Sequence, residues 1–77
     1  MDFYEKTMLE LMDMFNDWCN GDISNSTLET YLDSLLERDV FTTQEYYYMI
    51  DWLEVMDKAS AKEEIMDSIK EWFDRKK

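Results

Sequence analysis

Histidine and proline are absent from this sequence of 77 residues, and glycine and cysteine each occur once. Because proline and glycine interrupt helices and build tight turns, their scarcity favours long helices over sheets. The absence of histidine removes the residue that most often acts as a general base. The single cysteine, Cys19, cannot form a disulfide within the chain, which indicates a reducing compartment.

These absences also argue against catalysis. Cys19 has no histidine partner and no glycine-rich loop beside it, so no feature of the sequence would activate its thiol as a nucleophile. We therefore expect a protein that is not an enzyme, with no catalytic residues and no cofactor.

Long hydrophobic runs are missing as well. The N-terminal segment MDFYEKTML lacks the basic region and the apolar run of a signal peptide. No apolar run is long enough to cross a bilayer. We expect a soluble cytoplasmic protein, which would act in the host cytoplasm if it is phage-encoded.

Basic residues are scarce. Eight Lys and Arg residues stand against 19 Asp and Glu residues, which gives a net charge of −11. Three of the eight bases are the last three residues, Arg75, Lys76 and Lys77, so the rest of the chain is more acidic still. Direct binding to nucleic acid or to an anionic membrane needs Lys and Arg to neutralise phosphates, and is therefore not expected. A basic partner surface is favoured instead.

Apolar residues recur at helical spacing in four segments, which predicts an all-α fold. We expect one acidic helical domain over residues 1–77, a small compact bundle with helices at about residues 2–19, 27–38, 43–58 and 61–75. The short connections predict roughly antiparallel neighbours.

The segment Tyr46–Met56, YYYMIDWLEVM, is the most apolar of the chain. Tyr46, Met49, Ile50, Leu53 and Met56 share one helical face, and Tyr48, Trp52 and Val55 share an adjacent one. A helix that is apolar over more than half its circumference has neighbours on several sides, so we expect this third helix to be central. Tyr47 is left facing water. Since Tyr and Trp are enriched at interface hot spots, Tyr47 and Trp52 are candidate aromatic anchors for a partner.

Helix ends are predicted from local signals. Gly21 should end the first helix, because glycine adopts the left-handed conformation without strain from a Cβ atom. Three capping boxes, in which a Ser or Thr and a Glu three residues later satisfy each other's backbone N–H groups, should begin the other helices. They are Ser26–Glu29, Thr42–Glu45 and Ser60–Glu63.

The run Asn16–Thr27, NDWCNGDISNST, resembles a calcium-binding EF-hand loop in its middle. Gly21 falls where that loop turns sharply, and Ile23 falls where two such loops pair. The ligand positions do not follow the pattern, because Trp18 occupies the third position and Thr27 stands where a bidentate Glu should close the site. We therefore expect no metal site, and interpret the run as a helix end followed by a polar linker.

Carboxylates form rows along the predicted helices. Like charges at i, i+4 destabilise a helix by roughly 0.2–0.5 kcal/mol per pair. The net charge also exceeds the magnitude of about 2–8 that solubility needs in a small domain. Two interpretations stay open, which are solvation and mimicry of a polyanion. The candidate partner-binding carboxylates are Asp13, Asp17, Glu29, Asp33, Glu37, Glu64, Asp67 and Glu71.

The leading hypothesis is a small acidic protein that inhibits a basic partner protein, especially a nucleic-acid-binding one, by presenting these rows as a DNA mimic does. Phage-encoded inhibitors of host machinery, anti-restriction proteins and anti-CRISPR proteins are of this type. One alternative is a helical interaction module or an obligate homodimer that works through a patch of Met and aromatic residues. Another is an acidic antitoxin or immunity protein, which uses the same charge.

Overall fold

The computed structural model describes the backbone of residues 2–55 and 58–76, and the side chains of all but 55–61 among them. This part of the chain contains helices and no strand, so the predicted all-α fold with four helices is confirmed. The helices are α1 (Phe3–Asn20), α2 (Asn25–Glu37), α3 (Thr43–Val55) and α4 (Lys58–Lys76).

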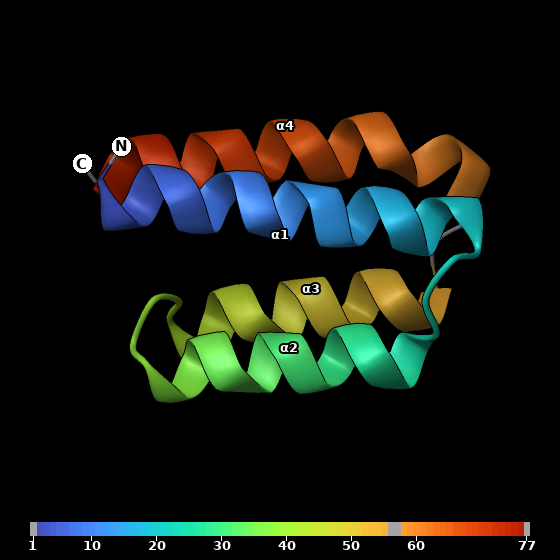
Figure 1. Ribbon diagram of the computed structural model, residues 1–77, viewed down its shortest axis with the longest axis horizontal. Helices are drawn as coiled ribbons and strands as arrows, with labels where there is room; N and C mark the ends of the chain where they lie inside the picture. Colours follow the sequence, from blue (N-terminus) through green and yellow to red (C-terminus); the bar gives the residue numbers. More distant parts are fainter. Residues whose placement is uncertain (1, 56–57, 77) are drawn as a thin grey trace.

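The four helices run alternately up and down in a bundle (Figure 1). The long helices α1 and α4 lie side by side, and the shorter α2 and α3 form the other pair, with α1 also contacting α2. A helix of 19 residues, the length of α4, spans roughly 28 Å, which matches the longest dimension of the molecule, 30 Å. The expectation that the third helix is central is not confirmed, because α3 is one of two helices in the shorter pair.

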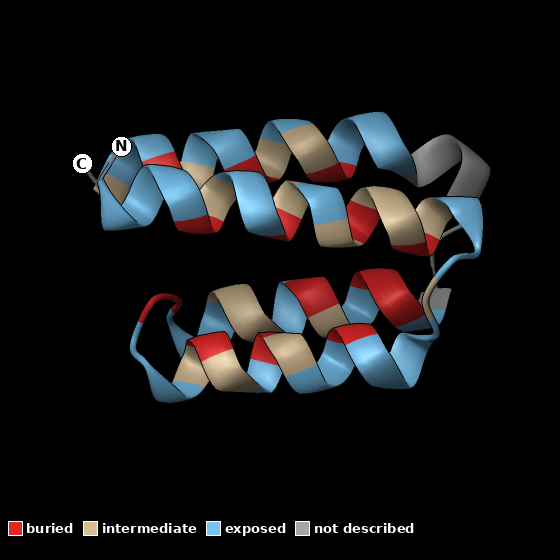
Figure 2. Ribbon diagram, in the orientation of Figure 1, coloured by how far each residue is buried: buried red, intermediate tan, exposed pale blue. Residues whose placement is uncertain are grey.

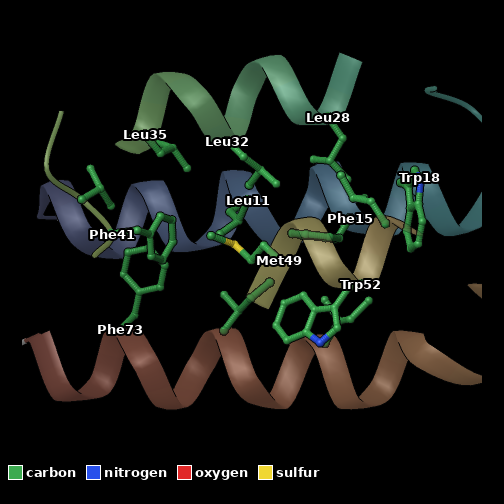
Figure 3. Close-up of a cluster of buried hydrophobic side chains, with 14 residues drawn as sticks. Leu11, Phe15, Trp18, Leu28, Leu32, Leu35, Phe41, Met49, Trp52 and Phe73 are labelled. Carbon is green, nitrogen blue, oxygen red and sulfur yellow. The ribbon is translucent and has the colours of Figure 1, made fainter. Parts of the chain in front are cut away.

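The hydrophobic core lies between the two helix pairs. Figure 2 shows the buried residues on the facing sides of the helices and the exposed ones on the outer sides. Figure 3 shows side chains from all four helices and from the α2–α3 connection meeting there. The buried apolar residues are Leu11, Phe15, Trp18, Leu28, Leu32, Leu35, Val40, Phe41, Met49, Trp52, Leu53, Ile65, Ile69 and Phe73.

Aromatic rings connect the two pairs across this core. Phe15 of α1 packs edge to face against Trp52 of α3, with ring centroids 5.9 Å apart. Trp52 in turn stacks on Trp72 of α4, at 5.3 Å and an interplanar angle of 11°. Phe41, in the α2–α3 connection, packs edge to face against Phe73 at 5.4 Å. Large aromatic side chains bury the most area per residue, which suits so small a domain.

Gly21 ends α1 as predicted. Its φ angle of 82° lies in the left-handed region. Its N–H donates to the carbonyl of Trp18 at 3.1 Å, and the N–H of Asp22 donates to the carbonyl of Asp17 at 2.9 Å. This pair of bonds satisfies two carbonyls that the helix end would otherwise leave without partners.

The end of α2 has the same geometry without a glycine. Asp39 has a φ angle of 59°, a conformation that Asp tolerates better than most residues. Its N–H donates to the carbonyl of Leu36, and the N–H of Val40 donates to that of Leu35, both at 3.1 Å. The reversal directs Val40 and Phe41 into the core, where both are buried.

The predicted start of α2 at Ser26 is wrong. Ser24 is the N-cap, and its side chain accepts a hydrogen bond from the N–H of Thr27 at 3.2 Å. The helix begins earlier because Asn25 is held in place by other helices. Its Oδ1 accepts a hydrogen bond from the indole N–H of Trp18 at 2.5 Å, and its Nδ2 donates to the carbonyl of Leu53 at 3.3 Å.

Of the other two capping boxes, one is confirmed and one does not begin its helix. The backbone N–H of Thr42 donates to Glu45 Oε1 at 2.9 Å, and the N–H of Glu45 donates to Thr42 Oγ1 at 3.2 Å. Ser60, by contrast, lies within α4, which begins at Lys58. Ala, Lys and Glu, which follow Ser60, are strong helix formers and propagate a helix as readily as they begin one.

Candidate functional site

The carboxylates of the predicted rows lie on the surface of the bundle. Asp17, on α1, is half-buried, and the other seven are exposed. The rows of α1 and α4 belong to helices that lie side by side, whereas the row of α2 belongs to the other pair. The exposed carboxylates are Asp13 on α1, Glu29, Asp33 and Glu37 on α2, and Glu64, Asp67 and Glu71 on α4.

Few of these carboxylates are neutralised by a neighbouring base. Among the described residues there are two ion pairs. Glu71 pairs with Arg75 at 2.5 Å on the exposed side of α4, and Glu45 pairs with Lys76 at 2.9 Å. The predicted rows of α1 and α2 thus have no ion-pair partner within the described part of the chain.

Two carboxylates instead accept hydrogen bonds from tyrosines. Asp33 accepts one from the hydroxyl of Tyr46, and this bond, together with burial and the charges of Asp33 and Glu29, raises the pKa of Tyr46 to about 12. Burial and a hydrogen bond to Glu10 likewise raise the pKa of Tyr31 well above its ordinary value. Asp33 therefore helps to hold α3 against α2 as well as contributing charge.

The ion pair between Glu45 and Lys76 is a structural contact. The two side chains are 17% and 19% exposed, and the Lys76 ammonium also lies 5.5 Å from the centre of the Phe41 ring. Burial alone would raise the pKa of Glu45. The hydrogen bond from the backbone of Thr42 and the bond to Lys76 outweigh it, so the pKa is lowered. The contact joins the start of α3 to the end of α4.

Trp52, one of the two candidate aromatic anchors, belongs to the core. Its side chain is 8% exposed, between Phe15 and Trp72. A ring in that position has too little accessible surface to bind a partner. Tyr48, placed by the sequence on the same apolar face as Trp52, is in contrast 53% exposed.

The outer side of α3 carries two neighbouring aromatic rings that are each more than half exposed. Tyr47 is 64% exposed, as its position in the predicted helix indicates. Gln44 lies three residues before Tyr47 and four before Tyr48, and Asp51 lies four and three residues after them. Glu54 is three residues beyond Asp51. Residues at these spacings share one side of the helix, called here the α3 face and made up of Gln44, Tyr47, Tyr48, Asp51 and Glu54. The helical spacing that leaves Tyr47 facing water does the same for Gln44, Asp51 and Glu54, whereas it places Tyr48 on an apolar face.

The α3 face borders a shallow hollow that is wide open to solvent. An open depression of about 820 Å³ is lined, among the described residues, by α3 alone, including all five residues of the α3 face and Ile50. A second groove of about 590 Å³ runs between α3 and α4. Gln44 and Tyr48 line both, so the Tyr48 side chain is accessible from either side.

Neither a metal centre nor a membrane span is found in the described part of the chain. No group of three or more potential metal ligands is close enough to hold an ion there. None of its helices has the length and apolar character that crossing a bilayer requires.

No protein-family model, curated protein or solved structure matches this chain.

Proposed function

We propose that this protein binds a basic surface of another protein and blocks it, through carboxylates displayed on several sides of the bundle. The observation that supports this function is the exposure of the acid rows on α1, α2 and α4, with two ion pairs among the described residues of a chain of charge −11. Such charge gives electrostatic steering and complementarity toward a cationic patch.

The energetics favour a surface kept for binding. Glu29, Asp33 and Glu37 stand at i, i+4 and i+8 of α2, so each neighbouring pair destabilises the free helix by roughly 0.2–0.5 kcal/mol. Interleaved lysines would remove this repulsion and leave the protein soluble. A basic partner relieves the same repulsion, because its cations neutralise the row on contact.

A nucleic-acid-binding protein is the partner class that fits this surface best. Its Lys and Arg side chains are arranged to neutralise phosphates, which lie at one charge per about 1.7 Å of duplex. A single helical row offers a carboxylate per roughly 6 Å, and rows on adjacent helices such as α1 and α4 raise that density. By occupying the phosphate-binding surface, the protein would act as an inhibitor of the DNA-mimic kind, as phage and anti-CRISPR inhibitors do.

The first experiment is capture of partners from a host lysate at low and at high salt. Capture that weakens steeply with salt, followed by loss of the partner's nucleic-acid binding, is the expected result. Capture that is unchanged between the two salt concentrations would contradict charge-driven binding.

The decisive variants reverse charge on α2 without touching its packing. Glu29→Lys and Glu37→Lys are suitable because both residues are exposed and neither is the N-cap of the helix, which is Ser24. Asp33 is left intact, since it accepts the hydrogen bond from Tyr46. We expect the double variant to lose about tenfold or more in affinity for the captured partner with its melting curve preserved.

Glu29→Gln with Glu37→Gln is the matched control, because it removes charge without reversing it. Its affinity should fall between those of the natural chain and the Lys variant. If the natural chain, the Lys variant and the Gln variant bind the partner with equal affinity, the carboxylates of α2 serve only solubility and take no part in binding.

A second candidate function is an interaction module, or a homodimer, that works through apolar contacts. The exposure of Tyr47 and Tyr48 favours it. The methionines whose side chains the structure describes do not add to such a patch, because Met49 is buried and Met8, Met12, Met14 and Met66 pack against the core. Binding of this kind would hardly change with salt, which distinguishes the two candidates in the first experiment.

A further inference from the structure

The rings of Tyr47 and Tyr48 on α3 are exposed, and neighbouring aromatic rings hold both of them in place. Tyr47 lies edge to face with Tyr46 at 5.7 Å, and Tyr46 is in turn tied to Asp33. Tyr48 lies against Trp72 of α4 at 6.3 Å. Rings that are already oriented lose little conformational freedom on binding, which favours recognition.

The charge of the α3 face identifies the chemistry of its occupant. Asp51 is four residues after Tyr47 and three after Tyr48, and Glu54 is three residues further on. Side chains at these spacings are neighbours on a helix surface. No basic side chain is present among the described residues that line the hollow. Two rings beside two carboxylates are complementary to a cation that also has a flat face.

We infer that the α3 face receives an arginine side chain of the basic partner, with its guanidinium stacked on Tyr47 or Tyr48 and paired with Asp51 and Glu54, which presupposes the charge-driven binding proposed above. The guanidinium is planar, stacks on aromatic rings and forms paired hydrogen bonds with a carboxylate. The ammonium group of lysine is compact and strongly hydrated, and matches this combination less well. The α3 face therefore adds arginine specificity to the general attraction of the acid rows.

A second copy of this chain is the less suitable occupant. Two α3 faces packed together would bring Asp51 and Glu54 of one copy toward the same carboxylates of the other. Juxtaposed like charges oppose such an interface. A short chain segment with arginine has the opposite charge, and the open hollow leaves its side chain free access to the two rings and the two carboxylates.

The experiment uses two probes, an oligoarginine peptide and an oligolysine peptide of equal length. Their affinities for the full chain are measured by calorimetry at low and at physiological salt, and their contact sites are mapped from backbone amide shifts by NMR. We expect oligoarginine to bind at least about threefold tighter than oligolysine, with the largest shifts on α3. The Tyr47→Ala, Tyr48→Ala variant should remove that preference.

Conservative variants separate the stacking from the fold. Tyr47→Phe with Tyr48→Phe keeps both rings and should keep the arginine preference. Because both tyrosines are more than half exposed, the Ala variant should also melt close to the natural chain. Arginine preference that survives the Ala substitutions would overturn the inference.

A matched pair of charge variants tests the carboxylates. Asp51→Asn with Glu54→Gln removes two charges from the α3 face, and Asp22→Asn with Glu5→Gln removes two exposed charges elsewhere. The first variant should lose the preference for arginine, and the second should keep it while binding both peptides slightly more weakly. Equal effects of the two variants would overturn the inference.

The remaining outcomes distinguish the inference from the proposed function. Binding of both peptides with equal affinity, mapped to the acid rows of α1, α2 or α4, would overturn the arginine site and leave the charge-driven function standing. Binding of neither peptide at low salt would overturn both. Sedimentation could instead show a dimer of the natural chain that is lost in the Tyr47→Ala, Tyr48→Ala variant. That result would identify a second copy as the occupant of the α3 face and overturn the arginine site.

Discussion

Asn25→Ala should destabilise this protein more than any other substitution of an exposed side chain in α2. Asn25 is on the surface, but its amide joins three helices. Its Oδ1 accepts from the indole N–H of Trp18 on α1, and its Nδ2 donates to the carbonyl of Leu53 on α3. Trp18 is 1% exposed, so its hydrogen bond lies at the edge of the core.

The magnitude follows from the two bonds. Withdrawing the partner of a buried donor costs about 1–3 kcal/mol, and an ordinary hydrogen bond contributes about 0.5–1.5 kcal/mol. Water can reach the exposed position of Asn25 and replace part of what is lost. We therefore expect a loss of about 2 kcal/mol, or about 8–16 °C in melting temperature for a domain of this size.

Urea unfolding followed by tryptophan fluorescence measures this loss, with an unchanged m value as the sign that only stability has changed. Asn25→Asp is the control, because it keeps an oxygen for the Trp18 indole and adds a favourable charge to the first turn of α2. It should recover only part of the stability, because a carboxylate cannot donate to the carbonyl of Leu53 as the Asn25 Nδ2 does. In a Trp18→Phe background, Asn25→Ala should cost clearly less, since the donor is already gone. A loss below about 0.5 kcal/mol in the natural background would refute the reasoning.

Four further substitutions test the helix ends and the contacts between helices. In urea unfolding, Ser24→Ala should lower the free energy of unfolding by about 1 kcal/mol, and Ser26→Ala should lower it by less than about 0.5 kcal/mol. The reverse order would indicate that Ser26 caps α2, as the sequence predicts. Because folding lowers the pKa of Glu45, the ionised side chain stabilises the folded protein at pH values above its unfolded pKa. This stabilisation is lost as pH falls through the folded pKa. Glu45→Gln should therefore destabilise at pH 7 and converge with the natural chain toward about pH 2, and a constant difference would contradict this. Folding raises the pKa of Tyr46, so the hydrogen bond to Asp33 contributes its full stability below the unfolded pKa of about 10 and loses it as pH rises through about 12. Asp33→Asn should therefore lower the pH at which the absorbance of the Tyr46 phenolate appears in a spectrophotometric titration.

Local patterns in the sequence predict the helices because the signals lie within a few residues. Four segments with apolar residues at helical spacing become the four helices of the described chain. Gly21 ends α1, since glycine alone among the residues there adopts a left-handed conformation without strain. Thr42 and Glu45 cap α3, because the two partners are three residues apart and need no other part of the chain.

Other helix ends depend on contacts between helices. Ser24 and Ser26 are equally good caps by type, and the choice falls to Ser24 because Asn25 is engaged by Trp18 and by the carbonyl of Leu53. Asp39 takes a left-handed conformation that its sequence does not require, in a turn that places the next residues in the core.

The candidate site shows the same division. The net charge and the exposure of most carboxylates follow from composition and spacing, because a charged side chain that can reach water will do so. Tyr48 and Trp52 are one helical turn apart on the same apolar side of α3, so the periodicity of the sequence cannot predict which of the two is more deeply buried. The position of α4 decides, since Trp72 stacks on Trp52 and covers it while leaving more than half of Tyr48 in water. Helical spacing determines which residues share a face, but only the packing of α3 against α4 determines which of those residues a neighbour covers.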